Sequence, residues 1–284
     1  MLNIRAMSRA EVDTLVEWAA SEGWNPGRDD ADLFWAHDPQ AFVAAEQSGD
    51  LIGGGAITAY GTSFGFMGFF IIRPGFRGRG LGNTLWHARL ERLRARLAPD
   101  ATIGLDGVFN MQDYYARGGF VFSHRNLRFQ GRAGGDVESP PRDIVDARAL
   151  SLTDLAAYDR ACFPVDRASF LARWLRAPAA QARACMRNGR VAGYGVIRAC
   201  REGAKIGPLF ADDLEAARGL WHALAPCAGG GPVYLDVPEN NAAAMTLAVE
   251  LNMTEVFGCA RMYLGPPPLL CHERVFGVTT FELG

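Results

Sequence analysis

The stretch of the sequence best suited to chemistry is a glycine-rich loop that carries two arginines, Arg77-Gly78-Arg79-Gly80-Leu81-Gly82. Four apolar residues at 69–72 precede it and predict a buried strand. A helix is expected to begin near Asn83. Glycines let backbone N–H groups approach a phosphate closely, and the first N–H groups of a helix favour negative charge. The loop therefore predicts an anion site, to which Arg77 and Arg79 add charge-assisted hydrogen bonds.

The spacing of the glycines separates two kinds of phosphate-binding loop. A dinucleotide-binding loop needs the pattern G-x-G-x-x-G, and after Gly78 and Gly80 its third position falls on Asn83. The spacing instead fits R-x-x-G-x-G, on Arg77, Gly80 and Gly82. This pattern resembles the acyl-CoA pyrophosphate loop of the GNAT N-acetyltransferase superfamily.

The resemblance implies that acetyl-CoA is the cosubstrate. Acetyl-CoA is expected to bind along Phe70, Ile71 and Ile72 through backbone hydrogen bonds, with its pyrophosphate on residues 77–82. The resemblance also implies that a primary amine attacks the thioester directly, without a covalent enzyme intermediate.

A second motif, Tyr115-Ala-Arg-Gly-Gly-Phe120, is similar to the Tyr-x-x-x-Gly-Phe signature of the same superfamily. In that family the tyrosine reaches into the cleft beside the thioester. Collapse of the tetrahedral intermediate expels CoA thiolate, and a phenol can protonate the sulfur. Free tyrosine and cysteine have pKa values of roughly 10 and 8.5, so the transfer needs no large tuning. We therefore expect Tyr115 to be the catalytic acid, rather than the neighbouring Tyr114.

The elements that must position these residues follow the order of the superfamily. Three strand-like runs, over 42–45, 51–59 and 64–72, are expected to be antiparallel and to lead into the loop. An apolar stripe that starts at Trp86 predicts an amphipathic helix after the loop. The arginines of this helix, Arg89 among them, are expected on its solvated face.

Two helices, expected over residues 9–22 and near 30–36, resemble the lid over the acceptor site in this superfamily. Their connecting loop is acidic around a tryptophan. The resemblance implies that Trp24, Asn25 and Asp29 hold a cationic small-molecule amine. Alternatively, the acidic cluster is a solvated face without a ligand.

The second half of the chain repeats the first. Residues 47–57 align with 187–197, and 104–108 align with 234–238. We therefore expect an α/β fold with mixed sheets, made of two tandem GNAT-like domains. Each domain is expected to be a twisted, mostly antiparallel sheet flanked by helices.

The catalytic domain is expected over residues 1–132 and the second domain over 143–284. A Gly/Pro/Ser-rich linker at 133–142 would join them. The final run, 271–283, is expected to be a strand that closes the sheet or bridges the domains.

The second copy lacks the residues that the chemistry needs. In place of the glycine loop it has residues 211–217, which contain no glycine and three carboxylates that would repel a pyrophosphate. Ala248 stands where the first copy has Tyr115. We expect this domain to be structural or to shape the acceptor site.

The general base stays unassigned. Asp106, at the end of an expected strand over 102–106, is a candidate for substrate contact and for proton abstraction. Asp236 holds the matching place in the second copy, which favours a structural role for both carboxylates. A water relay to the acidic residues of the lid is the alternative.

Composition limits the partners. The net charge of −2 gives no electrostatic case for nucleic acid, and no stretch approaches membrane-spanning length. The five histidines lack metal-ligand spacing, so no metal is expected.

The six cysteines contain no C-x-x-C pair and the first residues form no signal core, which favours reduced thiols in the cytoplasm. Lys205 is the only lysine, which indicates a GC-rich, bacterial coding sequence. A monomer and a homodimer both remain open.

Two other functions compete with an acetyltransferase. One is a non-enzymatic module that binds or senses CoA, which would have no need of Tyr115 as an acid. The other is an NAD-type dehydrogenase with Asp106 as the ribose ligand. The antiparallel strands before the loop disfavour it, because a dinucleotide fold needs parallel strands joined by helices.

Overall fold

The computed structural model describes residues 2–134 and 143–284, so the expected linker lies almost wholly outside the described residues. The first half of the chain has its strands and helices in the order that the sequence predicts. Its elements are β1 (Leu2–Ala6), α1 (Arg9–Ser21), α2 (Asp30–His37), β2 (Phe42–Gln47), β3 (Asp50–Tyr60), β4 (Phe64–Ile72), α3 (Leu81–Arg94), β5 (Thr102–Val108), α4 (Gln112–Arg117) and β6 (Val121–Arg132).

The second half repeats this order and adds one short strand. Its elements are β7 (Ile144–Asp146), α5 (Leu152–Cys162), α6 (Ala168–Trp174), β8 (Ala180–Arg187), β9 (Arg190–Ala199), β10 (Ala204–Ala211), α7 (Leu214–Leu224), β11 (Pro232–Pro238), α8 (Ala242–Glu250), β12 (Thr254–Leu264) and β13 (Val275–Gly277).

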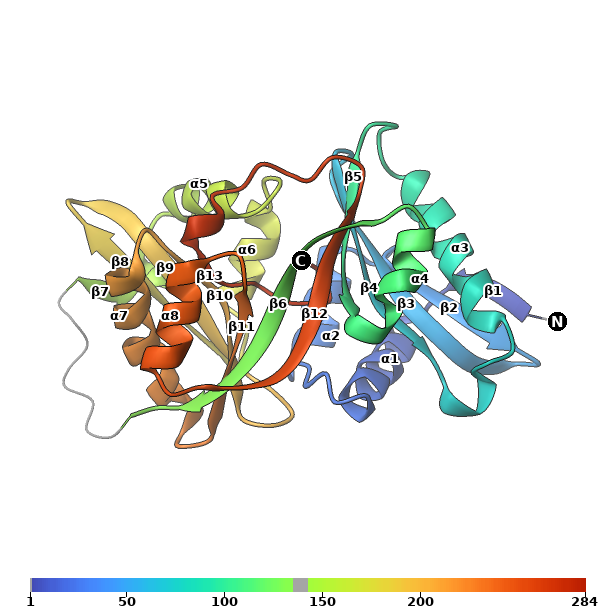
Figure 1. Cartoon of the computed structure of the whole chain (residues 1–284), viewed down its shortest axis with the longest axis horizontal. Helices are drawn as coiled ribbons and strands as arrows, with labels where there is room; N and C mark the ends of the chain where they lie inside the picture. Colours follow the sequence, from blue (N-terminus) through green and yellow to red (C-terminus); the bar gives the residue numbers. More distant parts are fainter. Residues whose placement is uncertain (1, 135–142) are drawn as a thin grey trace.

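The strands of the described residues pair into one continuous 13-stranded sheet that passes through both halves (Figure 1). The order is β1-β2-β3-β4-β5-β12-β6-β11-β10-β9-β8-β7, and β13 is attached to β10. The last strands of the two halves are therefore exchanged. β12 lies between β5 and β6 of the first half, and β6 is antiparallel to β11 of the second. The expected mixed α/β fold is confirmed.

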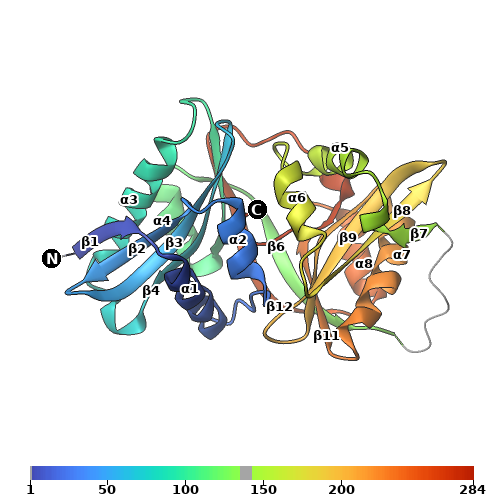
Figure 2. The same ribbon diagram turned by 180° about the vertical axis from the view of Figure 1, so that it is seen from behind.

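The helices cover the two faces of this sheet in the same way in both halves. Figure 1 shows α3 and α4 on the near face of one half, and α7 and α8 on the same face of the other. Seen from behind, α1 and α2 cover one half and α5 and α6 the other, with α2 next to α6 (Figure 2). Apolar residues of α1 and α2, such as Leu15 and Phe34, belong to one core with Phe170 and Trp174 of α6. This shared core packs the two halves together at the lid.

The chain ends inside the molecule rather than at its edge (Figure 1). β13 pairs with β10, and the following residues, 278–284, are buried between the halves. The expected strand at 271–283 is therefore confirmed over 275–277, and the residues that follow bridge the two halves.

Candidate active site

β4 and β5 separate halfway along their length. They pair in parallel from Phe64 opposite Thr102 to Met67 opposite Leu105, and the pairing ends there. Phe69 has a φ of 51°, and the register with β3 shifts at the same point. This bulge turns β4 away from β5. The backbone of β4 beyond Met67 therefore has no strand partner on the β5 side in the described structure, which leaves its polar groups for a ligand.

A cavity of about 470 Å³ opens where the two strands separate. It brings together residues that the sequence had placed in the cofactor site, in the acceptor site and in the catalytic motif. These are Phe70, Ile71, Ile72, Arg77, Gly78, Gly82, Tyr115, Trp24 and Asp106. The other loop residues, Arg79, Gly80 and Leu81, do not line the cavity.

The glycine loop presents an uncapped helix terminus. Gly80 is the N-cap of α3, with a left-handed φ of 76°, and it carries no side-chain cap. Gly78 also has a positive φ, of 74°. Both positions require glycine because an L side chain is strained there. The free N–H groups of the first turn and the helix dipole suit an anion at this end of the cavity.

Arg77 is held in place by the loop and by the lid. Its Nε donates to the carbonyl oxygen of Ile72 at 2.7 Å. Its guanidinium also pairs with Glu22, the residue that follows α1 and lines the same cavity. Glu22 therefore forms an ion pair with the arginine that the sequence assigns to the pyrophosphate.

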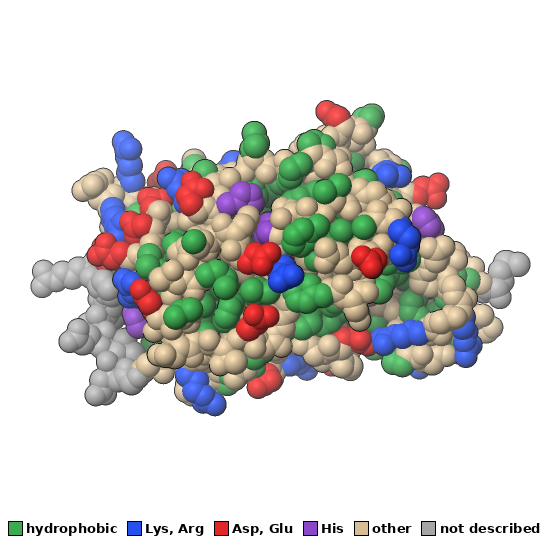
Figure 3. Space-filling view, in the orientation of Figure 1, with side chains coloured by type: hydrophobic (Ala, Val, Ile, Leu, Met, Phe, Trp, Pro, Cys, Tyr) green, Lys and Arg blue, Asp and Glu red, His purple; other side chains and the backbone are tan. Residues whose placement is uncertain are grey.

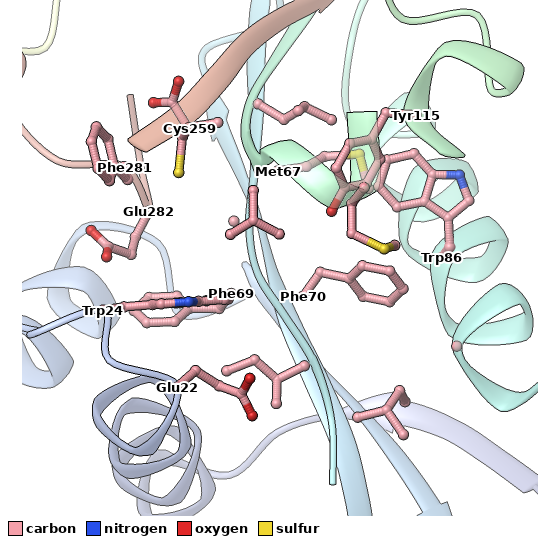
Figure 4. Close-up of a pocket in the computed structure, with 18 of the residues that line it drawn as sticks. Glu22, Trp24, Met67, Phe69, Phe70, Trp86, Tyr115, Cys259, Phe281 and Glu282 are labelled. Carbon is pink, nitrogen blue, oxygen red and sulfur yellow. The ribbon is translucent and has the colours of Figure 1, made fainter. Parts of the chain in front are cut away.

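The Tyr115 ring packs against the backbone of β5. A β-carbon on Gly107 would lie 2.3 Å from a ring carbon of Tyr115, so only glycine leaves room for the ring. Trp86 supports the other side, with ring centroids 5.0 Å apart. Figure 4 shows the hydroxyl turned toward the cavity. Burial raises the pKa of Tyr115, and the charge of Arg89 opposes that shift. The phenol therefore keeps its proton at neutral pH.

The position of Arg89 differs from the sequence-based prediction. Arg89 lies on the buried side of α3 and has no exposed surface, whereas the sequence predicted a solvated position. Its Nη2 donates to the carbonyl oxygens of Ala56 and Gly68, both at 2.6 Å. A β-carbon on Gly55 would lie 2.4 Å from its Cζ. Glycine on β3 therefore admits the guanidinium, which ties β3 to β4 at the bulge.

Comparison with known proteins identifies the fold. Residues 9–120 match the model of the acetyltransferase (GNAT) family, and residues 155–277 match that of an acetyltransferase (GNAT) domain. The chain belongs to the GNAT acetyltransferases. The two matches confirm two GNAT domains in tandem.

Similar proteins match nearly the whole length of the chain. A holothin acyltransferase of Pseudoalteromonas sp. (strain SANK 73390) is 25% identical over 278 residues, which cover 98% of this chain and 92% of that protein. A putative acetyltransferase from Pyrococcus horikoshii has a TM-score of 0.84 at 21% identity, covering 100% of this chain and 96% of that one. A tandem GNAT protein from the clavulanic acid biosynthesis pathway has a TM-score of 0.66 at 15% identity, covering 94% and 100%.

Asp106 lines the GNAT cavity but is neutralised. Its carboxylate accepts two hydrogen bonds from Arg261 of β12, at 2.8 and 2.7 Å, and one from Asn126 of β6 at 2.8 Å. Both carboxylate oxygens are therefore already engaged by protein donors. Asp106 therefore joins the exchanged strands, and this placement does not suit the base or substrate role considered for it.

The lid residues have different surroundings from one another. Trp24 lines the cavity, as expected for an acceptor contact. Asn25 instead bonds through its amide to the backbone of Glu202, and Asp29 accepts from the N–H of Ala179 at 3.0 Å. Both side chains connect the lid to the second half, so we leave them out of the acceptor site.

The second half has no open equivalent of this cleft in the described structure. β10 and β11 pair in parallel only from Ala204 to Ile206 and separate beyond that point, as β4 and β5 do. Here, however, β13 lies in the space between the two separated strands. Gly277 of β13 lies opposite Leu209 of β10, and the N–H of Val278 donates to the carbonyl oxygen of Asp236 on β11 at 2.9 Å. The chain's own C-terminal strand thus occupies the position that the first half leaves for a ligand.

The helix that follows is also closed to an anion. The Asp213 side chain caps α7 by accepting from the N–H of Ala216 at 2.9 Å. A protein carboxylate therefore sits where Gly80 leaves the N-terminus of α3 free.

Sequence reasoning missed the part of the cavity that the second half supplies. Phe257 and Cys259 of β12, with Phe281 and Glu282 of the C-terminal residues, line it. Figure 4 shows Cys259, Phe281 and Glu282 on the same side of the cavity as Trp24. The local sequence around them carries no catalytic motif. Burial raises the pKa of the Cys259 thiol well above its usual value, so the thiol stays protonated at neutral pH.

Proposed function

We propose that the first half of the chain transfers an acetyl group from acetyl-CoA to a primary amine. The observation that carries the proposal is that the glycine loop, the unpaired edge of β4 and the Tyr115 hydroxyl open into one cavity. The pyrophosphate binds at the N-terminus of α3, and the pantetheine arm pairs with the backbone of residues 70–72. The thioester then lies at the separation of β4 and β5, beside Tyr115.

The reaction needs a proton donor at the sulfur. The amine attacks the thioester carbon, and the tetrahedral intermediate collapses by breaking its C–S bond. Tyr115 supplies the proton to the thiolate, because its buried phenol is neutral at the pH of the reaction. The cleft also holds the two substrates in a reactive orientation, which contributes to the rate enhancement.

The second half has a supporting role in this proposal. Its cleft is filled by β13 and its α7 terminus is capped by Asp213, so it binds no acetyl-CoA. It contributes β12 and the C-terminal residues to the acceptor side of the first cleft.

The dehydrogenase alternative is wrong. Each of the consecutive strands β1 to β4 is antiparallel to the one before it, whereas a dinucleotide fold needs parallel strands. The family match is also to GNAT acetyltransferases. A CoA-binding module without activity is disfavoured by the Tyr115 hydroxyl in the cavity.

The direct test measures thiol release from acetyl-CoA against a panel of amines. Amine-dependent release supports the proposal, and acetyl-CoA binding without release from any amine would favour the binding module.

A further inference from the structure

The C-terminal residues are anchored in both halves. Nη2 of Arg167, the residue before α6, donates to Oγ1 of Thr279 at 2.8 Å. On the other side, the Tyr60 hydroxyl of β3 donates to the carbonyl oxygen of Leu283 at 2.9 Å. The stretch between these anchors, 280–282, is therefore held against the cavity of the first half.

Glu282 differs from the other carboxylates that line the cavity. Glu22 is paired with Arg77, and Asp106 is paired with Arg261. The side chain of Glu282, 3% exposed, accepts a hydrogen bond from the Thr280 hydroxyl and has no ion pair among the described residues. It is the cavity carboxylate left to meet a cationic ligand.

Buried charged side chains from both halves lie around Glu282. Arg128 on β6 pairs with Asp236 at 2.6 Å, and Arg198 on β9 pairs with Asp30 at 3.0 Å. Lys205 on β10 is buried beside them, 4.0 Å from Asp236. Burial and Arg128 lower the pKa of Lys205, and the charges of Asp236 and Glu282 oppose that shift. The cluster therefore holds three basic side chains and two other carboxylates, and Glu282 is its third carboxylate.

Aromatic side chains surround this part of the cavity. Figure 4 shows Glu282 together with Trp24 and Phe281, across the cavity from Tyr115 and Trp86. The rings of Phe281 and Phe257 are 6.1 Å apart. Aromatic faces and one carboxylate together suit a cation carried on an apolar body.

The groove that leads to this side is also partly apolar. It shares Trp24 and Phe257 with the cavity and continues past Phe109 and Val256, which are 42% and 49% exposed. Figure 3 shows hydrophobic side chains gathered over the middle of the molecule, where β12 crosses between the halves. Glu22, Glu255 and Asn110 also line this groove, so selection against a multiply charged amine falls to the aromatic rings inside the cavity.

We infer that Glu282 is the acceptor-side carboxylate, which binds the ammonium group and takes up its proton, and that the acceptors are compact aromatic or apolar amines with one positive charge. This inference rests on the proposed acetyltransferase function. The second half of the chain thereby supplies a catalytic residue to the first.

Three proton transfers accompany the proposed reaction. R–NH₃⁺ gives one proton to the Glu282 carboxylate, and the nitrogen lone pair forms the C–N bond to the thioester carbon. The C–S bond breaks, the sulfur takes the proton of Tyr115, and the nitrogen loses its second proton to water. The products are the amide and CoA thiol, and solvent returns a proton to Tyr115 and removes one from Glu282.

The test compares the wild type with Glu282→Gln, using acetyl-CoA with 2-phenylethylamine or spermidine. For the wild type we expect kcat/KM at least tenfold higher with 2-phenylethylamine. In E282Q, kcat/KM for this amine at pH 7 should fall on the order of a hundredfold, which is a general-base contribution. The deficit should narrow as the pH approaches the pKa of the amine, because the neutral amine needs neither ammonium binding nor deprotonation. Affinity for acetyl-CoA should stay within twofold.

Glu91→Gln, on the exposed side of α3, is the matched control and should behave as wild type. A folded E282Q with more than a third of wild-type kcat/KM, a loss that is equal at all pH values, or a preference for spermidine overturns the inference. If E282Q does not fold, Glu282→Asp replaces it: the shortened carboxylate should lower kcat/KM, and unchanged kcat/KM overturns the inference. A wild type that acetylates no amine contradicts the proposed function itself.

Discussion

A β-carbon on Gly68 would lie 2.0 Å from the carbonyl oxygen of Glu282. The bare backbone of β4 at this position lets the C-terminal residues reach the edge of the cavity. Glycine is therefore needed here for close approach of a chain segment that lies more than 200 residues later in the sequence.

Gly68→Ala should displace the C-terminal residues. We expect a loss of about 1–3 kcal/mol in the free energy of unfolding, the usual cost of overpacking, together with a higher KM for the amine. Chemical denaturation and steady-state kinetics measure both effects. Gly75→Ala, where a β-carbon meets nothing within 4 Å, is the control. Equal stability of the two variants would contradict this placement of Glu282.

Glu22→Gln should release Arg77 for the pyrophosphate. The exposed ion pair competes with the ligand, and such pairs contribute about 0.2–1 kcal/mol. Affinity for acetyl-CoA should therefore rise by a factor of between about 1.4 and 5 at low salt. Calorimetric titration measures it, with Glu17→Gln on the outer surface of α1 as control. Weaker binding would mean that Glu22 itself helps to hold the cofactor.

Tyr115→Phe should lower kcat on the order of a hundredfold and leave acetyl-CoA affinity unchanged. Tyr114→Phe, which loses only a hydrogen bond of 3.1 Å to Asn83, should lower kcat far less. Because burial raises the pKa of Tyr115, its acid form persists as the pH rises. The kcat of the wild type should therefore decline only above about pH 10. Wild-type kcat in Tyr115→Phe would remove this residue from the mechanism.

The two copies should respond oppositely to changes at their helix N-termini. Gly80→Glu places a carboxylate at the proposed pyrophosphate site and should abolish acetyl-CoA binding. Gly80→Ala, which carries the backbone strain without the charge, should bind more weakly than wild type but detectably. Asp213→Ala should cost about 1 kcal/mol of stability through loss of the α7 cap, with unchanged binding. Loss of binding in Asp213→Ala would assign a cofactor to the second half.

The loop and the tyrosine motif could be read from the sequence because each acts through local spacing. Gly80 and Gly82 stand in fixed positions relative to one strand and one helix, and Tyr115 stands four residues before Gly119. The same holds for the repeat, whose copies keep their strand patterns. Such signals do not depend on contacts between distant segments.

The rest of the site depends on distant contacts that the sequence does not encode locally. The matching Asp236 already favoured a structural role for Asp106, but its partner Arg261 could not be named, because their pairing requires the exchange of strands between the halves. The run over 271–283 was expected to close the sheet or bridge the domains, but the approach of Glu282 to Gly68 follows from tertiary packing alone. Arg89 departed from its expected solvated face because Gly55 leaves room for a buried guanidinium.

The most direct measurement is a crystal structure of the protein grown with acetyl-CoA. The account predicts one cofactor per chain, with its pyrophosphate on residues 77–82 and its thioester between Tyr115 and Glu282. Density for the cofactor between β10 and β11, with β13 displaced, would contradict it.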